Sequence, residues 1–285
     1  MSDELKRQAA LVAVDEISNG MIVGLGTGST ASHFIRELGA RVRSGLKIAG
    51  IPTSEESRRL AEESGIPLTT FRDHKEIDVT VDGADEVSAD LDLIKGLGGA
   101  LVREKIVAHA SNRVIIVVDE SKLVDRLGSR TVIPVEVIPL AADCVLSQLT
   151  RWGGEAGIRQ KNGGPFITDN GNMIVDWNHG VIDQPALLEK ELKGITGVVF
   201  VELNGGDPAA KTLLAVTPEG KVPEIPSEKT GLQAKTIFRL LEVEPGTGSF
   251  LRNEDTPVDC DLMVVDGTSM VEVPLMNHLL RALPV

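Results

Sequence analysis

The stretch from residue 82 to residue 105 gathers side chains that can transfer protons. Asp82 and Asp85 stand close together, Lys95 opens a glycine-rich run, and Glu104 follows within the same span. Neighbouring carboxylates raise one another's proton affinity, whereas a nearby ammonium lowers it, so the set can hold acid and base forms near neutral pH. These residue types therefore indicate proton transfer rather than electron transfer.

Each of these residues alone has an ordinary explanation. Asp82-Gly83 is a common turn pair, and Glu104 taken singly fits a solvated helix position. The combination of two acids, an amine, a helix-borne glutamate and four glycines in one short span favours a functional site.

Two apolar runs deliver these residues to one place. Residues 77–81 lead directly into Asp82, and residues 91–94 lead directly into Lys95. Both runs are typical of buried strands, and a helical pattern over residues 100–110 carries Glu104. In open α/β sheets, ligands bind at the carboxyl ends of the strands. The side chains are therefore expected to converge on one crevice at that edge.

Residues 24–30, Gly-Leu-Gly-Thr-Gly-Ser-Thr, form a second candidate loop between a strand at 21–25 and a helix at 31–38. Such a loop offers backbone N–H groups and a positive helix end to an anion. No lysine follows the glycines, so the loop is not a Walker A motif, although residues 26–31 match the looser dinucleotide pattern G-x-G-x-x-A. Its three hydroxyls better suit a compact phosphate or a polyol. An ordinary tight turn is the alternative.

The chain alternates strands and helices up to about residue 128, which predicts an α/β fold of Rossmann-like type. We expect a mostly parallel sheet with helices on both faces. From residue 131 a β-α-β-β-α-β order, with a hairpin turn at Asn170-Gly171, predicts a smaller α+β domain with an antiparallel sheet. The predicted domains are residues 1–128 with 205–224, residues 129–204, and a C-terminal extension, 225–285, without an assigned role.

Composition excludes several classes of protein. A formal charge of −13 argues against nucleic acid as a partner, because phosphate backbones require basic patches. The two cysteines and five histidines have no metal-ligand spacing, so no metal is expected. The sequence has neither a signal peptide pattern nor an apolar run long enough to span a bilayer, which predicts a cytoplasmic protein without a membrane partner.

Six motifs together resemble the ribose-5-phosphate isomerase A family, over residues 3–222. They are GLGTGST at 24–30, VDGADEV at 81–87, IKGLGGALVREKI at 94–106, VDESKLV at 118–124, PVEVIP at 134–139 and TDNGN at 168–172. The family's IKGGG pattern is interrupted by Leu97, and the residues after Val222 match no part of the family.

The resemblance implies an isomerase that interconverts ribose 5-phosphate and ribulose 5-phosphate in the pentose phosphate pathway. It implies a homo-oligomer, either dimer or tetramer, with no metal or organic cofactor. Glu104 would move the proton between C1 and C2, Asp82 and Asp85 would serve hydroxyl protons and ring opening, and Lys95 would stabilise the oxyanion. The implied substrate-binding positions are Thr27, Gly28, Ser29, Thr30, Gly83, Ala84, Gly96, Leu97, Gly98, Lys122 and Lys6.

Three other functions compete with this interpretation. A sugar-phosphate sensor of transcription would need a DNA-binding helix-turn-helix and a basic patch, which the sequence lacks. A dinucleotide-dependent oxidoreductase would need an acid about twenty residues after the glycine loop. A sugar-phosphate deaminase or acyl-CoA transferase would share the fold class without the DGAD and KGxGGA motifs.

Overall fold

The computed structural model describes residues 3–88, 90–203 and 213–216. The chain divides between Pro218 and Glu219, and every described residue belongs to the first unit. No helix in these ranges is long and apolar enough to cross a membrane.

A five-stranded sheet forms the centre of what we call the α/β lobe, residues 3–128 and 213–216. All its strands run parallel, in the order β14-β6-β3-β1-β2. Buried β-branched side chains on the inner strands explain why these short segments form a sheet. The strands are β1 (Ile22–Leu25), β2 (Ala49–Pro52), β3 (Val79–Asp82), β6 (Val114–Val117) and β14 (Leu213–Val216).

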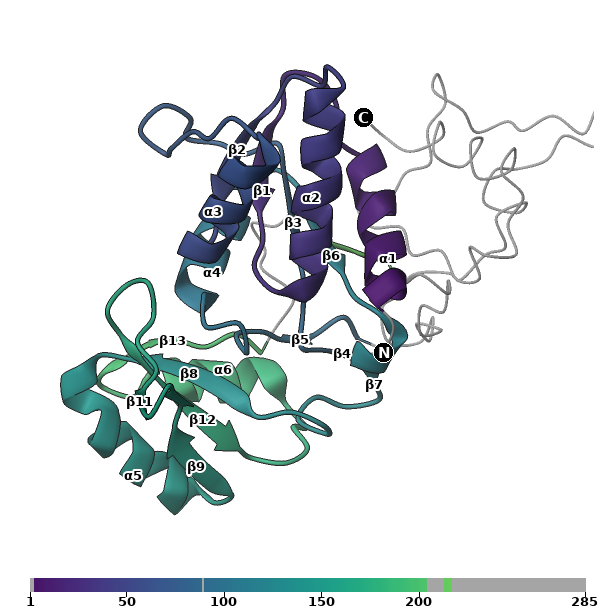
Figure 1. Ribbon diagram of the computed structural model, residues 1–285. Coiled ribbons are helices and arrows are strands. Elements are labelled where there is room, and N and C mark those ends of the chain that lie inside the picture. Colours follow the sequence, from purple (N-terminus) through teal and green to yellow (C-terminus); the bar gives the residue numbers. More distant parts are fainter. Residues whose placement is uncertain (1–2, 89, 204–212, 217–285) are drawn as a thin grey trace, which may run out of the picture. The chain divides into compact units, whose positions relative to one another are not determined.

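Helices cover both faces of this sheet. Three helices lie side by side in Figure 1 and share one core with β1, β3 and β6. They are α1 (Asp3–Asp15), α2 (Ser29–Arg43) and α3 (Glu55–Ser64). Helix α4 (Leu101–His109) packs against the opposite face, where Val107 contacts Ile51 and Ile77. The predicted α/β fold with helices on both faces is therefore confirmed.

The α/β lobe also contains a small three-stranded sheet near the start of the next segment. It pairs β4 (Glu86–Ser88) with β5 (Leu93–Ile94) and β7 (Leu123–Val124), the last of which follows the 3-10 helix η1 (Glu120–Lys122). The buried carboxylate of Glu86 accepts hydrogen bonds from the backbone N–H groups of Gly128, Arg130 and Thr131, at 2.6 to 2.8 Å. Glu86 therefore holds the connecting segment.

Residues 129–203, which we call the α+β lobe, build an antiparallel sheet of order β13-β8-β12-β9. Helices α5 and α6 share one core with the odd-numbered residues of β8 and β12, including Val135 and Trp177. The elements are β8 (Ile133–Val137), η2 (Pro139–Ala141), α5 (Ala142–Trp152), β9 (Glu155–Ile158), β10 (Gln160–Lys161), β11 (Gly164–Pro165), β12 (Met173–Asn178), α6 (Pro185–Lys193) and β13 (Val198–Phe200).

The secondary structure has three features that the local sequence pattern does not show. Residues 166–168 form no strand beyond one bridge from Ile167 to Met173, and the partner of β12 is β9 instead. Strand β9 has the sequence Glu-Ala-Gly-Ile, which has a low β propensity and does not predict a strand. Its extended conformation depends on pairing with β12. Residues 67–70 make only a single bridge at Leu68, and α2 begins at Ser29 rather than at residue 31.

The division into domains at residues 128/129 and 204/205 stays a prediction. Most of the predicted segment 205–224, and all of the extension 225–285, lie outside the described residues.

Candidate active site

Three buried, charged side chains meet beside the carboxyl end of β3. Lys95 Nζ lies 3.1 Å from Asp82 Oδ2 and 3.5 Å from Glu104 Oε2, and it donates a hydrogen bond to the carbonyl oxygen of Gly83. Asp82, Lys95 and Glu104 are only 3%, 6% and 4% exposed. The convergence expected from strands 77–81 and 91–94 and helix 100–110 therefore exists in the folded chain.

Burial and neighbouring charges shift the proton affinities of this group. Burial raises the pKa of Glu104 to about 8, with the Asp82 carboxylate adding to the rise and Lys95 opposing it. Burial works against the charge on Lys95, but the carboxylates of Asp82, Glu104 and Glu202 outweigh it and raise the pKa of Lys95. The site thus places a carboxylate of raised proton affinity beside an amine whose charged form is favoured.

Glu104 Oε2 accepts no hydrogen bond from any described residue, although it is fully buried. A buried carboxylate oxygen without a donor is unfavourable unless something else, such as a proton or a ligand, satisfies it. This oxygen is therefore free to take up a proton.

Asp85 belongs to the same acidic segment, and its Oδ2 accepts a hydrogen bond from the Leu97 N–H at 2.8 Å. Burial raises the pKa of Asp85, and the Leu97 N–H and the charges of Lys95 and Lys122 oppose that rise. Lys122, in η1, therefore lies close enough to Asp85 to influence its charge. Ala84, between the two aspartates, is half-buried.

The glycine-rich loop 24–30 ends at the N-terminus of α2. Gly28, the N-cap residue, has φ +102° and provides no side chain to cap the helix. The first turn therefore presents backbone N–H groups and a partial positive charge, together with Ser29 and Thr30. Lys6 Nζ, from α1, donates to Ser29 Oγ at 2.8 Å, so the predicted Lys6 does reach this loop.

The Thr27 hydroxyl belongs to a cluster of four hydroxyls. Its Oγ1 forms hydrogen bonds of 2.7 to 3.1 Å with the hydroxyls of Thr53, Ser54 and Ser57, while its N–H donates to Asp82 Oδ1 at 3.1 Å. The sequence analysis did not single out these three partners. Their position immediately after the carboxyl end of β2 is the signal that could have found them.

Gly26 is required by the close approach of the loop to Asp82. A Cβ at position 26 would lie 2.3 Å from Asp82 Oδ1 and 2.6 Å from the Asp82 Cα, both far inside van der Waals contact. The binding loop and the first catalytic candidate are thus packed directly against each other.

The second glycine run, 96–99, lies against the first. Gly96 has φ +110°, a Cβ at Gly98 would be 3.4 Å from the methyl group of Thr27, and Leu97 projects outward with 41% exposure. Arg159 Nη1, from the α+β lobe, donates to the carbonyl oxygens of Gly96 and Leu97 at 3.0 and 2.9 Å. Leu97 therefore leaves the loop's backbone contacts with Asp85 and Arg159 intact.

Arg103, the residue before Glu104, connects three segments at this edge. Its guanidinium donates to Glu55 Oε1 at 3.1 Å, to the carbonyl oxygen of Asp169 at 2.9 Å and to Asn170 Oδ1 at 2.9 Å. Asp169 Oδ2 in turn accepts from the Glu55 N–H at 2.7 Å. These contacts hold the 168–172 loop beside α4. The sequence analysis gave Arg103 no role, because its partners are distant in the chain.

Two family models match the chain. The model described as ribose 5-phosphate isomerase A (phosphoriboisomerase A) matches residues 49–215. A model described as an AAA domain matches residues 193–285, which include the extension for which the sequence analysis found no counterpart.

Curated relatives and solved structures agree with the isomerase match. Ribose-5-phosphate isomerase A of Methanothermobacter thermautotrophicus is 51% identical over 76% of this chain and 95% of the relative. The Gluconobacter oxydans protein of that name is 47% identical over 75% and 94%.

Solved ribose 5-phosphate isomerases have the same fold. The structure from Methanocaldococcus jannaschii superposes with a TM-score of 0.71 and 46% identity, covering 76% of this chain and 96% of that one. A D-ribose-5-phosphate isomerase solved with phospho-erythronic acid has a TM-score of 0.69 and 42% identity, covering 72% and 91%. The chain therefore belongs to the ribose 5-phosphate isomerase A family.

Proposed function

We propose that the chain interconverts D-ribose 5-phosphate and D-ribulose 5-phosphate by proton transfer through an enediolate. The observation that carries this proposal is the buried contact of Lys95 with both Asp82 and Glu104. Removing a carbon-bound proton next to a carbonyl needs a base at carbon and a positive charge for the oxygen that becomes negative. This site supplies both, and family membership supplies the substrate.

Glu104 acts as the base at carbon. Its raised pKa gives the ionised carboxylate a high affinity for the proton of the substrate's C2. When that proton transfers, Glu104 becomes neutral and the negative charge moves to the sugar oxygen. Lys95 lies 3.5 Å from Glu104 and pairs with the Glu104 carboxylate before the step. After the step it pairs with the negative sugar oxygen. The charge separation during proton transfer is therefore small.

The two aspartates serve the oxygen-bound protons. Burial raises the pKa of Asp85, so this carboxyl can carry a proton for ring opening and between the sugar hydroxyls. Asp82 accepts from the N–H groups of Thr27 and Gly83 and pairs with Lys95, which orients the amine toward the substrate. The N-terminus of α2, with Lys6 and Lys122, receives the phosphate.

A direct assay tests the function. Purified protein incubated with ribose 5-phosphate and a chelator should produce ribulose 5-phosphate, measured by the absorbance of the ketose product after derivatisation. Absence of turnover by folded protein would overturn the proposed reaction. Loss of turnover only in the presence of the chelator would overturn the metal-free mechanism.

The homo-oligomer implied by the family and the cytoplasmic location expected from the sequence are part of the same proposal. Sedimentation of the full chain distinguishes a dimer or tetramer from a monomer.

The pH dependence of kcat/KM should follow Glu104. The base must be ionised in the free enzyme, so a pKa raised to about 8 predicts that kcat/KM increases with pH and levels off above pH 8. The Glu202 carboxylate contributes to the raised value, so Glu202→Gln should lower the pKa of Glu104 and move the rising limb to lower pH. If the rising part of the kcat/KM profile does not move in this variant, the ionisation that it reports belongs to a group other than Glu104.

Lys122→Ala should weaken the binding of phosphorylated substrate. A charge-assisted contact contributes about 1.5 to 3 kcal/mol, so KM for ribose 5-phosphate should rise by roughly tenfold or more, with little change for unphosphorylated ribose. Lys190→Ala, at an exposed position of α6, serves as the matched control. Equal losses for both substrates would place Lys122 outside the phosphate site.

Removal of residues 223–285 should leave kcat within a few-fold of the full chain. The relative from Methanothermobacter thermautotrophicus is matched over 95% of its length by 219 aligned residues, which indicates that the chemistry needs no part of the extension. Circular dichroism establishes folding of the truncated protein before kinetics are compared. A folded but inactive product would show that the extension supplies residues to the site.

A further inference from the structure

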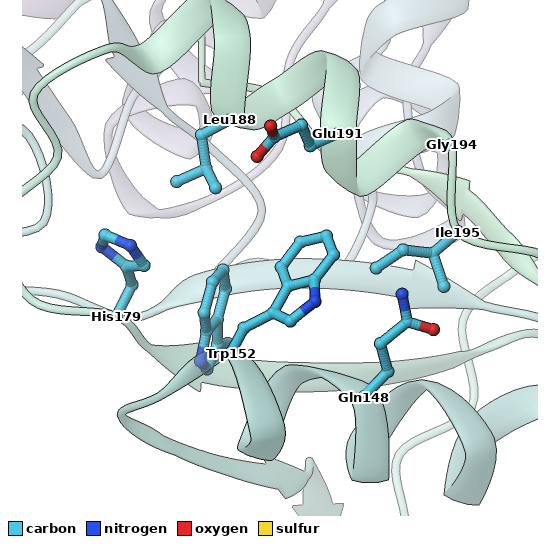
Figure 2. A pocket seen from close by; sticks show the side chains of 8 residues that line it. Gln148, Trp152, His179, Leu188, Glu191, Gly194 and Ile195 are labelled. Atoms are coloured by element: carbon cyan, nitrogen blue, oxygen red, sulfur yellow. The ribbon is translucent and has the colours of Figure 1, made fainter.

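A groove in the α+β lobe lies outside the proposed active site. It has a volume of about 640 Å³, within the range of small-molecule sites. Helices α5 and α6 form its sides and β12 its floor, and none of the residues assigned to the isomerase site lines it. In Figure 2, Leu188 and Glu191 come from α6 on one side of the groove and Gln148 and Trp152 from α5 on the other, with His179 at one end. We call this the aromatic groove.

The chain has only two tryptophans and no tyrosine, and both tryptophans line this groove. Trp177 is buried as the floor, where its Nε1–H donates to the carbonyl oxygen of Gly153 at 2.8 Å. Trp152 packs against Trp177 edge to face, with ring centroids 6.1 Å apart, and remains 43% exposed. The buried indole thus supports an exposed one whose ring remains accessible to a ligand.

Glu191 is the one acidic side chain that lines the aromatic groove, and no lysine or arginine lines it. Among the described residues, neither the Glu191 carboxylate nor the Gln148 amide has a side-chain hydrogen bond or ion pair. Glu191 is exposed, and of the cations near it in the sequence Lys193 pairs with Glu189, whereas Lys190 is exposed. The lining of the groove, with one carboxylate and no lysine or arginine, therefore has a negative character.

Two helix ends add to this character. Helix α5 ends at Trp152 and α6 ends just before Gly194, and both residues line the aromatic groove. The C-terminus of a helix carries about half a negative charge. An anion would be repelled here, and a neutral sugar would leave the carboxylate without a partner of opposite charge.

We propose that the aromatic groove binds a small organic ammonium ion. The cation would lie over the face of the Trp152 indole, which attracts positive charge through its ring quadrupole. Its ammonium would be paired by Glu191, and its alkyl groups would contact Leu188. The ligand belongs to a different chemical class from the sugar phosphate, so this site is separate from the isomerase activity.

The intrinsic fluorescence of the full chain tests this directly, because every tryptophan of the protein lines the groove. Choline is titrated at pH 8, and sodium chloride at equal ionic strength provides the baseline. Dimethylbutanol, the uncharged carbon isostere of choline, measures how much of the binding depends on charge. We expect a saturable change with choline and none of comparable affinity with dimethylbutanol.

Variants locate the binding. Glu191→Gln should raise the half-saturating choline concentration by about threefold or more, on the scale of losing one charge contact at a solvent-accessible site. Glu155→Gln, the same change at an exposed position of the same lobe, should leave it unaltered. A titration that does not saturate, equal affinity for choline and dimethylbutanol, or equal effects of the two substitutions would each overturn the proposal.

Discussion

Glu104→Gln is expected to lower isomerisation by about 10³-fold or more while the protein still folds and binds sugar phosphate. The substitution keeps the shape of the side chain and removes its basicity, and general base catalysis contributes on this scale. Only a group that touches the carbon-bound proton can govern its removal. The variant should therefore also lose the exchange of substrate deuterium at C2 with solvent, followed by NMR.

Two measurements separate this outcome from a folding defect. The binding of phospho-erythronic acid, the compound held by a related isomerase, should persist in the variant, because Glu104 is not part of the phosphate-binding loop. Glu104→Asp keeps a carboxylate but shortens the side chain by one methylene group, so the base lies further from the substrate. This variant should retain part of the activity. Exchange at C2 near the wild-type rate in Glu104→Gln would instead make one of the two aspartates the base.

Lys95→Met should reduce kcat by roughly a hundredfold or more, with a smaller change in KM. In the proposed mechanism the ammonium stabilises charge that develops on the sugar oxygens in the transition state, and removing one such donor has effects of this size. Lys95 also opposes the raised pKa of Glu104, so its loss should move the rising limb of the pH profile to higher pH. The two effects together identify Lys95 as an electrostatic partner of both the substrate and the base.

The control for Lys95 concerns stability, because its removal leaves Asp82 and Glu104 as buried carboxylates without their cation. Breaking a buried ion pair costs about 3 to 5 kcal/mol, so the melting temperature must be measured with the kinetics. Lys95→Arg keeps the charge and should retain more activity than Lys95→Met at equal folded fraction. A defect in KM alone would assign Lys95 to ground-state binding.

The sequence alone determined the parallel sheet and the candidate site stretch, residues 82–105. The β-branched runs before Asp82 and at residues 114–117 predicted buried strands, because such side chains favour a pleated, fully covered surface. The carboxyl end of β3 brings Asp82 to the ligand-binding edge of the parallel sheet, as the pattern predicted. The meeting of Asp82 with Lys95 and Glu104 was also predicted, but Lys95 follows β5, which pairs antiparallel with β4 outside the parallel sheet.

Only the tertiary structure decided how these groups are tuned and held. The raised pKa of Glu104 comes first from its burial, which no spacing in the sequence reveals. Arg103 forms hydrogen bonds with Glu55 and Asn170, which are 48 and 67 residues away in the sequence. Thr27 forms one with Ser57, which is 30 residues away. Contacts between residues so far apart depend on how the elements pack. Short-range propensity and periodicity carry no information about that packing.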